Sequence, residues 1–316
     1  MRRAAGAGLA ACLVAVAACG QPGFPAKVVG VAAGVAPAVG VPAPHGGYLG
    51  VYEGGAQQSY GPIEEFAQAV GYQPRIVAYL SRWGRPFPAG FVSQAHAHGA
   101  IPLIQIGPNG ASMKGIAAGR YDGYLRWYAR AVADYGNAVI IGFARDMNGR
   151  SYPWGWAHTP ARVWVTAWRR VVTIFRQQYV PNVTWLWTVS QVSKRTGPLR
   201  AYWPGAQYVD WVGIDGYYVT RAPTFEAAFA PTIRAARELT RDPILLSEVG
   251  IGLPAGQARE IGDLFAGIRR YHLTGLVWFD VTRRGGISAQ DWRLEGHRAA
   301  LGVFRRGVAA MLAPPG

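Results

Sequence analysis

The sequence predicts a single (β/α)8 barrel, an α/β fold, and three observations support this prediction. Eight short runs of β-branched and aromatic residues recur along the chain, and stretches with helical spacing separate them. The chain has 316 residues, of which 50% are apolar, and a barrel of about 250 residues is commonly one domain. A doubly wound open sheet is the alternative, but no glycine-rich phosphate-binding turn follows the first run, so the barrel is favoured.

The expected strands can be placed in chain order from these runs. They are Tyr48–Glu53, Ile76–Trp83, Ile101–Gly107, Ala138–Asp146, Val183–Ser190, Asp210–Tyr218, Pro243–Gly250 and Gly275–Val281. Helical spacing is clearest over Thr159–Tyr179, Thr224–Thr240 and Ala255–Tyr271. Strands that alternate with helices favour a parallel barrel, so we assign residues 48–310 to one catalytic-type barrel domain.

The first 19 residues have the features of an export signal. Arg2 and Arg3 give a positive start, and the apolar run Leu9–Ala18 is too short to span a bilayer. Small residues directly before Cys19 resemble the bacterial lipobox, in which the cysteine is lipidated. We therefore expect residues 1–19 to be a lipoprotein signal peptide, and the exported protein to be held at the bacterial cell surface by a lipid anchor on Cys19 in the membrane. An ordinary signal peptide, cut at the same place, is the alternative.

Residues 20–47 are rich in Pro, Ala, Gly and Val without a steady period, which is typical of a linker. Cys12 and Cys19 are the only cysteines, so the remainder of the chain can form neither a disulfide nor a thiolate metal site. The six histidines show no metal-binding spacing. We expect no cofactor and no metal.

The net charge of +15 is carried almost entirely by arginine. Such a balance raises nucleic acid as a partner, but the expected export and the scattered arginine pairs argue against it. Arginine pairs at helical positions are typical of a solvated face, and attraction to an anionic membrane or wall polymer is the functional alternative. We expect no nucleic-acid partner and a monomeric protein.

Carboxylates and aromatic residues gather at the expected carboxyl ends of the strands, where barrel enzymes hold their active sites. The carboxylates are Glu53, Asp146, Asp215, Glu248 and Asp280, and the aromatics are Trp83, Trp154, Trp156, Trp187, Tyr217, Tyr218 and Trp278. Aromatic faces stack on sugar rings, and two carboxyl groups flank the bond that a glycosidase cleaves. The pattern predicts sugar hydrolysis. Trp185 and Trp187 share one strand face and could equally fill the core.

Three segments resemble glycoside hydrolase family 26, the endo-β-mannanase-like family of retaining barrel glycosidases. Phe143–Trp154 is similar to its strand-4 signature, usually His-Glu-Met-Asn-Gly-x-Trp-Tyr-Pro-Trp. Val209–Tyr217 is similar to its strand-6 signature, and Pro243–Gly250 to its strand-7 nucleophile segment. The segments occur in family order, and the resemblance covers roughly residues 45 to 305.

The resemblance implies a retaining mechanism on a β-linked polysaccharide, with β-mannan favoured and β-1,3/1,4-glucan, xylan or the cell's own exopolysaccharide left open. Glu248 would be the nucleophile and Asp146 the acid/base. Tyr217 would orient the nucleophile. The other expected substrate-binding residues are Asn148, Trp154, Arg145, Trp187, Trp278 and Trp83.

The strand-4 segment departs from the family pattern at the acid/base itself. Asp146 stands where the family has a glutamate, and Arg145 stands where it has a histidine. A neighbouring guanidinium is expected to lower the pKa of Asp146, which is the wrong direction for a general acid. Two alternatives follow. The protein is a catalytically reduced cell-surface lipoprotein that binds polysaccharide, or the acid comes from Glu53 or Asp280.

Overall fold

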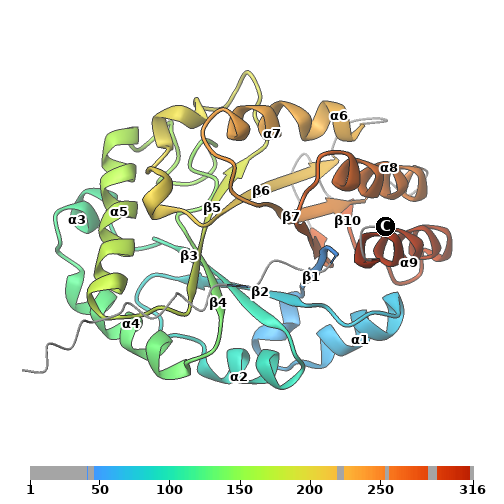
Figure 1. Ribbon diagram of the computed structural model, residues 1–316, viewed down its shortest axis with the longest axis horizontal. Helices are drawn as coiled ribbons and strands as arrows, with labels where there is room; N and C mark the ends of the chain where they lie inside the picture. The colour runs from blue at the N-terminus through green and yellow to red at the C-terminus, as the bar shows by residue number, and fades with distance from the viewer. Residues whose placement is uncertain (1–40, 42–45, 219–223, 253–255, 284–289, 314–316) are drawn as a thin grey trace, which may run out of the picture. The chain divides into compact units, whose positions relative to one another are not determined.

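Eight parallel strands close into one barrel in the order β1 to β8, and helices lie outside it as a ring (Figure 1). The computed structural model describes residues 41, 46–218, 224–252, 256–283 and 290–313. The strands are β1 (Tyr48–Tyr52), β2 (Ile76–Arg82), β3 (Ile101–Gly107), β4 (Val139–Phe143), β5 (Val183–Ser190), β6 (Trp211–Tyr218), β7 (Ile244–Ile251) and β8 (Gly275–Phe279). The prediction of a (β/α)8 barrel is confirmed.

An α-helix follows each strand except β5, which is connected to β6 by two 3-10 turns. The helices are α1 (Gly61–Val70), α2 (Ala89–Ala97), α3 (Met113–Ala117), α4 (Asp122–Tyr135), α5 (Ala161–Gln177), α6 (Phe225–Ala228), α7 (Ala230–Arg237), α8 (Gln257–Arg270) and α9 (Arg298–Leu312). Short 3-10 turns cover Gly54–Gln57, Leu199–Tyr202 and Ala206–Tyr208, and a small hairpin after β8 pairs β9 (Thr282–Arg283) with β10 (Gln290–Asp291).

Two expected elements differ from the structure. The fourth strand ends at Phe143 rather than Asp146, because Ala144 and Asp146 adopt left-handed backbone angles, with φ of 48° and 59°, that a strand cannot continue. The single helix expected over 224–240 is two helices that break at Phe229, just before Pro231, which starts α7 in its first turn. The expected signal peptide, Cys19 and most of the linker fall outside the described residues and stay predictions.

Strand side chains alternate between a barrel interior and an outer layer beneath the helices. One cluster fills the interior and includes Tyr48, Leu103, Leu186, Trp211 and Leu245. A larger cluster lies between the strands and the helices. Because both faces of a parallel barrel are buried, the strands are apolar along most of their length. Apart from Thr184 at the start of β5, buried polar side chains such as Gln105, Thr188, Asp215 and Ser247 lie toward the carboxyl ends of their strands, which places the site there.

The regular alternation fails at one place in β7. Asp215 of β6 pairs with Glu248, whereas Gly213 pairs with Leu245, so β7 holds one residue more than β6 between these pairs. The register against β8 shifts over the same residues, between Leu246 and Val249. This is a β-bulge, which re-aims a side chain relative to the rest of its strand. Here the bulge contains Glu248.

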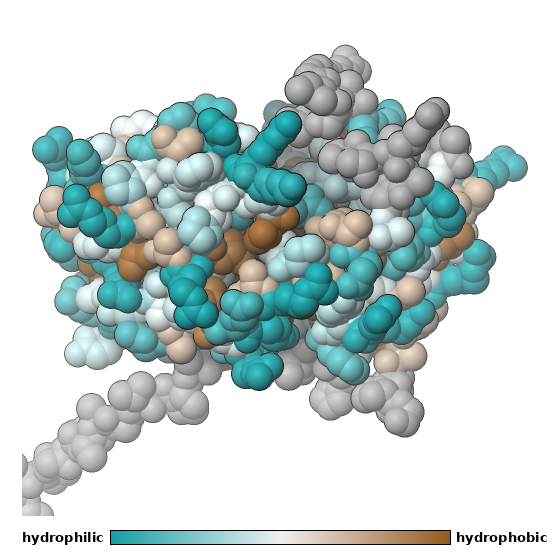
Figure 2. All heavy atoms as spheres, turned by 90° about the horizontal axis from the view of Figure 1, so that it is seen from above, coloured by the Kyte–Doolittle hydropathy of each residue, from teal (hydrophilic) through white to brown (hydrophobic). Residues whose placement is uncertain are grey.

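Hydrophilic residues cover most of one face of the molecule, and apolar residues appear there as small patches (Figure 2). The paired arginines of α8 and α9, Arg269-Arg270 and Arg305-Arg306, are exposed. Within the described part of the chain, no helix has both the length and the apolar character needed to cross a bilayer.

Candidate active site

The site is centred on Arg145, which follows β4. Its Nε lies 3.8 Å from Asp146 Oδ2, 3.8 Å from Asp215 Oδ2 and 3.9 Å from Glu248 Oε2. The Arg145 side chain is 15% exposed and the three carboxylates are 5–16% exposed. One guanidinium therefore faces three largely buried carboxylates, two of which are the residues expected to perform catalysis.

The interior-facing side chains at the carboxyl end of β6 bring Asp215 and Tyr217 into the same space. Asp215 accepts a hydrogen bond of 2.6 Å from the Ser247 hydroxyl of β7. The Tyr217 hydroxyl donates to Glu248 Oε1, and the Tyr217 ring stacks on Trp292 at 4.3 Å. Tyr217 thus lies beside the expected nucleophile and is held by an aromatic ring that the sequence did not single out.

Asp146 is positioned by its backbone and by β5. The Ser190 hydroxyl at the end of β5 donates to Asp146 Oδ1 at 2.5 Å. Asn148 fixes Ser190 in turn, because its amide accepts from Ser190 N at 2.8 Å and donates to Ser190 O at 2.9 Å. Asn148 is fully buried, so the expectation that it shapes a sugar subsite is corrected. It is a positioning residue that acts on Asp146 through Ser190.

The pKa of Asp146 also differs from the sequence-based expectation. Burial raises the pKa of this carboxyl above its ordinary value, and this effect outweighs the lowering by Arg145 and by the Ser190 hydrogen bond. The pKa of Asp215 is raised well above its ordinary value, first by burial and then by the charges of Asp146 and Glu248. Arg145 lowers the Asp146 pKa as expected, but burial raises it by more, so the net direction is upward. A raised pKa suits a group that must supply a proton near neutrality.

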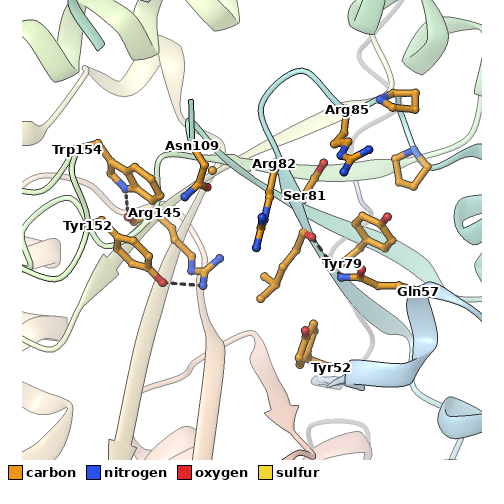
Figure 3. Close-up of a pocket in the computed structure, with 14 residues that line it drawn as sticks. Tyr52, Gln57, Tyr79, Ser81, Arg82, Arg85, Asn109, Arg145, Tyr152 and Trp154 are labelled. Atoms are coloured by element: carbon orange, nitrogen blue, oxygen red, sulfur yellow. Dashed lines mark hydrogen bonds between the residues drawn. The ribbon is translucent and has the colours of Figure 1, made fainter. Parts of the chain in front are cut away.

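A cleft of about 730 Å³ opens next to this cluster, over the carboxyl ends of β1, β2 and β3. Arg145, Tyr152 and Trp154 line one side of it, and Tyr52 and Tyr79 line the other (Figure 3). Tyr152 and Trp154 stack at 4.5 Å with an interplanar angle of 6°, and Tyr152 accepts a hydrogen bond of 2.8 Å from Arg145 Nη2. Trp154 was expected here from the sequence, whereas Tyr152 and Tyr52 were not singled out.

The three other expected tryptophans do not line this cleft. Trp187 and Trp278 are fully buried in the outer layer, Trp187 against Trp203 and Trp278 against Phe304 of α9. Neither can stack on a sugar in this position, so these two expectations are corrected and both belong to the core. Trp83 is half-buried and packs on Tyr121, Tyr124 and Phe143. Strand alternation explains the outcome for Trp187, because Leu186 takes the interior position.

Glu53 and Asp280 form a separate carboxyl pair at the ends of β1 and β8. They are hydrogen-bonded to each other, and Asp280 Oδ1 also accepts from Trp278 Nε1 at 3.1 Å and from Leu294 N at 3.0 Å. Burial is the first cause that raises the Glu53 pKa to about 10 and the Asp280 pKa to about 7. These hydrogen-bond partners of Asp280 are different from the carboxylates that surround Arg145.

This carboxyl pair predicts a pH-dependent stability. A carboxyl whose folded pKa is raised contributes its full stability below its ordinary pKa, and that stability is lost as the pH rises through the folded pKa. The melting temperature is therefore expected to fall between pH 5 and pH 9. Because Glu53, with a pKa of about 10, has to take up a proton on folding at pH 9, Glu53→Gln should raise the melting temperature there by about 2–4 °C and flatten the profile. Asp134→Asn, an exposed carboxyl on α4, is the control. If the melting temperature of Glu53→Gln falls with pH as steeply as that of the wild type, the carboxyl pair is not responsible for the pH dependence.

Within the described residues, no group of three His, Cys, Asp and Glu side chains is arranged to hold a metal ion. The side chains that the structure brings together at this site are carboxylates, a phenol and a guanidinium. Such groups can donate protons, accept protons and attack a carbon centre.

Comparison with known proteins finds similarity to one glycosidase family and to its fold. The sequence model of glycosyl hydrolase family 26 matches residues 126–240. Endoglucanase H of Acetivibrio thermocellus is 25% identical over 273 residues, which cover 81% of this chain and 30% of that protein. β-1,3-xylanase TXYA of a Vibrio species is 29% identical over 114 residues, which cover 35% of this chain and 24% of that protein. This chain thus spans less than a third of the length of either relative.

Among solved structures, the family 26 β-mannanase BoMan26A of Bacteroides ovatus superposes with a TM-score of 0.64 and 16% identity, covering 85% of this chain and 90% of that one. At this identity the likeness supports the fold alone. Together with the family model, which spans the strand-4 and strand-6 segments, the comparisons confirm the resemblance to glycoside hydrolase family 26.

Proposed function

From its similarity to glycoside hydrolase family 26, we propose that this protein hydrolyses a β-linked polysaccharide with retention of anomeric configuration, and that β-mannan is the favoured substrate. Glu248 is the nucleophile and Asp146 the acid/base. The observation that carries the proposal is the position of both carboxylates against one guanidinium. Because Arg145 Nε lies 3.8 Å from Asp146 Oδ2 and 3.9 Å from Glu248 Oε2, these oxygens are less than about 8 Å apart. Retaining glycosidases hold the two carboxyl groups about 5–5.5 Å apart and inverting ones about 6.5–9.5 Å apart, so this limit is compatible with both, and retention is proposed from the family resemblance.

The reaction proceeds in two displacements. Glu248 attacks the anomeric carbon and forms a glycosyl ester while the bond to the leaving sugar breaks, and Asp146 gives its proton to the leaving oxygen. A water molecule then gives a proton to Asp146 and attacks the same carbon. This step releases the sugar, regenerates the Glu248 carboxylate and leaves Asp146 protonated again. The raised pKa of Asp146 supports its first role, because the proton must be present when the bond breaks.

Tyr217 and Arg145 keep Glu248 ionised and oriented in this scheme. The phenol donates to one oxygen of Glu248, and the guanidinium lies near the other. Both contacts favour the charged form that attacks. Tyr152 is half-buried and stacks on the buried Trp154, so the Tyr152 ring supplies an aromatic surface beside Arg145 on which a sugar ring can rest.

A catalytically reduced, polysaccharide-binding lipoprotein is the second candidate function. It is favoured by the short Asp146 side chain, because one of its oxygens is bound by Ser190 while the other lies near Arg145. In either case we propose an exported protein anchored at Cys19. The positive start, the short apolar run and the small residues before that cysteine support this localisation.

The proposed hydrolysis is tested by the release of reducing ends from β-mannan, β-1,3/1,4-glucan, xylan and bacterial exopolysaccharides, with a Glu248→Ala variant as the control. Cleavage of at least one polymer that disappears in the control is expected. No cleavage by the wild-type protein, together with retained binding of one polymer, would favour the binding function.

Asp146→Asn is expected to slow polysaccharide cleavage by about 10²–10⁴-fold while leaving the binding of the polymer unchanged. The loss should be much smaller for an aryl glycoside whose phenol leaves without a proton. The kinetics of both substrates and the dissociation constant of the polymer measure this. An equal loss with both substrates would argue against Asp146 as the proton donor.

A further inference from the structure

The cleft beside the carboxylate cluster is lined by three arginines. Arg82, Arg85 and Arg145 all contribute to its wall, and none of its lining residues is an aspartate or a glutamate. Arg82 and Arg85 are exposed. Across the described ranges, neither of these two guanidinium groups has an ion pair or a hydrogen bond. Three carboxylates surround Arg145 and more than offset its charge, so the uncompensated positive charge of the cleft comes from Arg82 and Arg85.

The fold directs Arg82 toward the cleft. Arg82 is the last residue of β2, and strand alternation places it on the same side as the interior residues Ile76 and Ala78. Its partner across the β2–β3 register is Gly107, which also lines the cleft. A Cβ at Gly107 would lie 2.6 Å from the Asn109 side-chain oxygen and 3.3 Å from the Trp154 ring, so the bare backbone keeps this part of the wall open.

Figure 3 shows the guanidinium groups of Arg82 and Arg145 extending into the same open space, with Tyr52 and Tyr152 at its edges. Aromatic faces provide stacking for sugar rings. A neutral sugar would use the arginines only as hydrogen-bond donors. A guanidinium matches a carboxylate with two parallel hydrogen bonds, and charges of one sign in a cleft concentrate ions of the other sign there.

We propose that this cleft binds an acidic sugar residue, and that the substrate is a β-linked polysaccharide bearing uronate-type carboxylates, held by Arg82 and Arg85 next to the bond that is cleaved. The identity of the polymer as a substrate rests on the proposed hydrolase function, whereas binding of the acidic sugar does not. Arg82 and Arg85 are specificity-determining residues in this scheme, and the neutral polar side chains of Gln57 and Asn109, which also line the cleft, complete the hydrogen bonds to the sugar hydroxyls.

The test compares two hexasaccharides of the same β-1,4 linkage that differ only at C6, mannohexaose and its mannuronate counterpart. Their dissociation constants are measured by calorimetry with the full chain carrying Glu248→Gln, so that neither ligand is consumed. We expect the acidic hexasaccharide to bind at least about tenfold more tightly at low salt, with a preference that shrinks as salt rises. Arg82→Gln and Arg85→Gln should each weaken its binding about three- to fivefold, and the double variant should bind both ligands about equally.

Arg130→Gln is the matched control, because Arg130 is an exposed arginine of α4 outside the cleft and its loss removes the same unit of net charge. It should change neither dissociation constant. Equal affinity for the two ligands, no binding of either, or an equal effect of Arg130→Gln would overturn the proposal. Tighter binding of the 6-sulfated hexasaccharide would overturn the carboxylate assignment. Equally tight binding of a single-stranded oligonucleotide would reveal a non-specific polyanion surface and overturn it as well.

Turnover by the wild-type protein separates this proposal from the hydrolase function. Preferential binding of the acidic ligand without release of reducing ends would leave the acidic-sugar site in place and remove the hydrolase function. Cleavage of mannohexaose, together with equal affinities for the neutral and the acidic hexasaccharide, would support the hydrolase function and overturn the acidic-sugar site.

Discussion

Replacement of Glu248 by glutamine is expected to lower kcat for polysaccharide cleavage by about 10⁴-fold or more, the largest effect of any single change in this site. Glutamine has the same shape and can still accept a hydrogen bond from Tyr217, but it cannot form the glycosyl ester. KM and the affinity for the uncleaved polymer should change little. The measurement is the initial rate of reducing-end release with wild-type and variant protein at matched concentrations.

The melting temperature of the Glu248→Gln variant is the control that shows whether it still folds. Removing one of three carboxylates that surround a single guanidinium relieves like-charge repulsion, so the melting temperature should be equal to or slightly above that of the wild type. A variant that cleaves at a tenth of the wild-type rate would exclude Glu248 as the nucleophile. A strong fall in melting temperature would assign it a structural role instead.

Arg145→Met is expected to destabilise the protein by about 3–5 kcal/mol at pH 8, the largest effect on folding. Methionine fills a similar volume but leaves Asp146, Asp215 and Glu248 without their cation, and it removes the hydrogen bond to Tyr152. The free energy of unfolding from urea titrations measures the effect. Arg130→Met on the surface of α4 is the matched control and should stay within about 0.5 kcal/mol of the wild type.

The pH dependence distinguishes this electrostatic cost from a packing defect. Arg145 lowers the pKa of both Asp146 and Asp215, so its loss raises these pKa values further above their ordinary range. A raised carboxyl pKa means stability that is present at low pH and lost as the pH rises. The destabilisation by Arg145→Met should therefore be smaller at pH 5 than at pH 8. The same loss at both pH values would indicate that volume, rather than charge, is responsible.

Most of the barrel could be predicted from the sequence, because each strand is a short apolar run and the runs are well separated. The β3 and β5 strands match their expected bounds, and the others differ by one to three residues at their ends. The largest difference is at β4, where the left-handed angles of Ala144 and Asp146 end the strand early. A positive φ is uncommon outside glycine, and although aspartate adopts it more often than most residues, nothing in the apolar run indicates it at Ala144.

The site was predictable where it depends on residue type and position along a strand. Asp146, Tyr217, Glu248 and Arg145 were each expected near the carboxyl ends of the barrel, and the structure brings them together. The direction in which side chains point was harder to predict. The outward position of Trp278 depends on which strand face meets the interior. The burial of Asn148 depends on its two hydrogen bonds to the Ser190 backbone, which is distant in sequence. The raised pKa of Asp146 depends on burial by neighbours that are distant in sequence.

The extra residue in β7 shifts the alternation of inward and outward side chains by one position between the two halves of the strand. Leu245 faces the interior and Leu246 faces the helices, so strict alternation would turn residue 248 toward the helices. Because the alternation shifts at this point, Ser247 and Glu248 can both reach the interior, where they meet Asp215 and Tyr217. The side chains in the amino-terminal half of β7 therefore alternate as the packing of the core requires. After the bulge, the extra residue shifts this alternation by one position. The direction of the attacking carboxylate is thus set by the bulge and not by the packing of the first half of the strand.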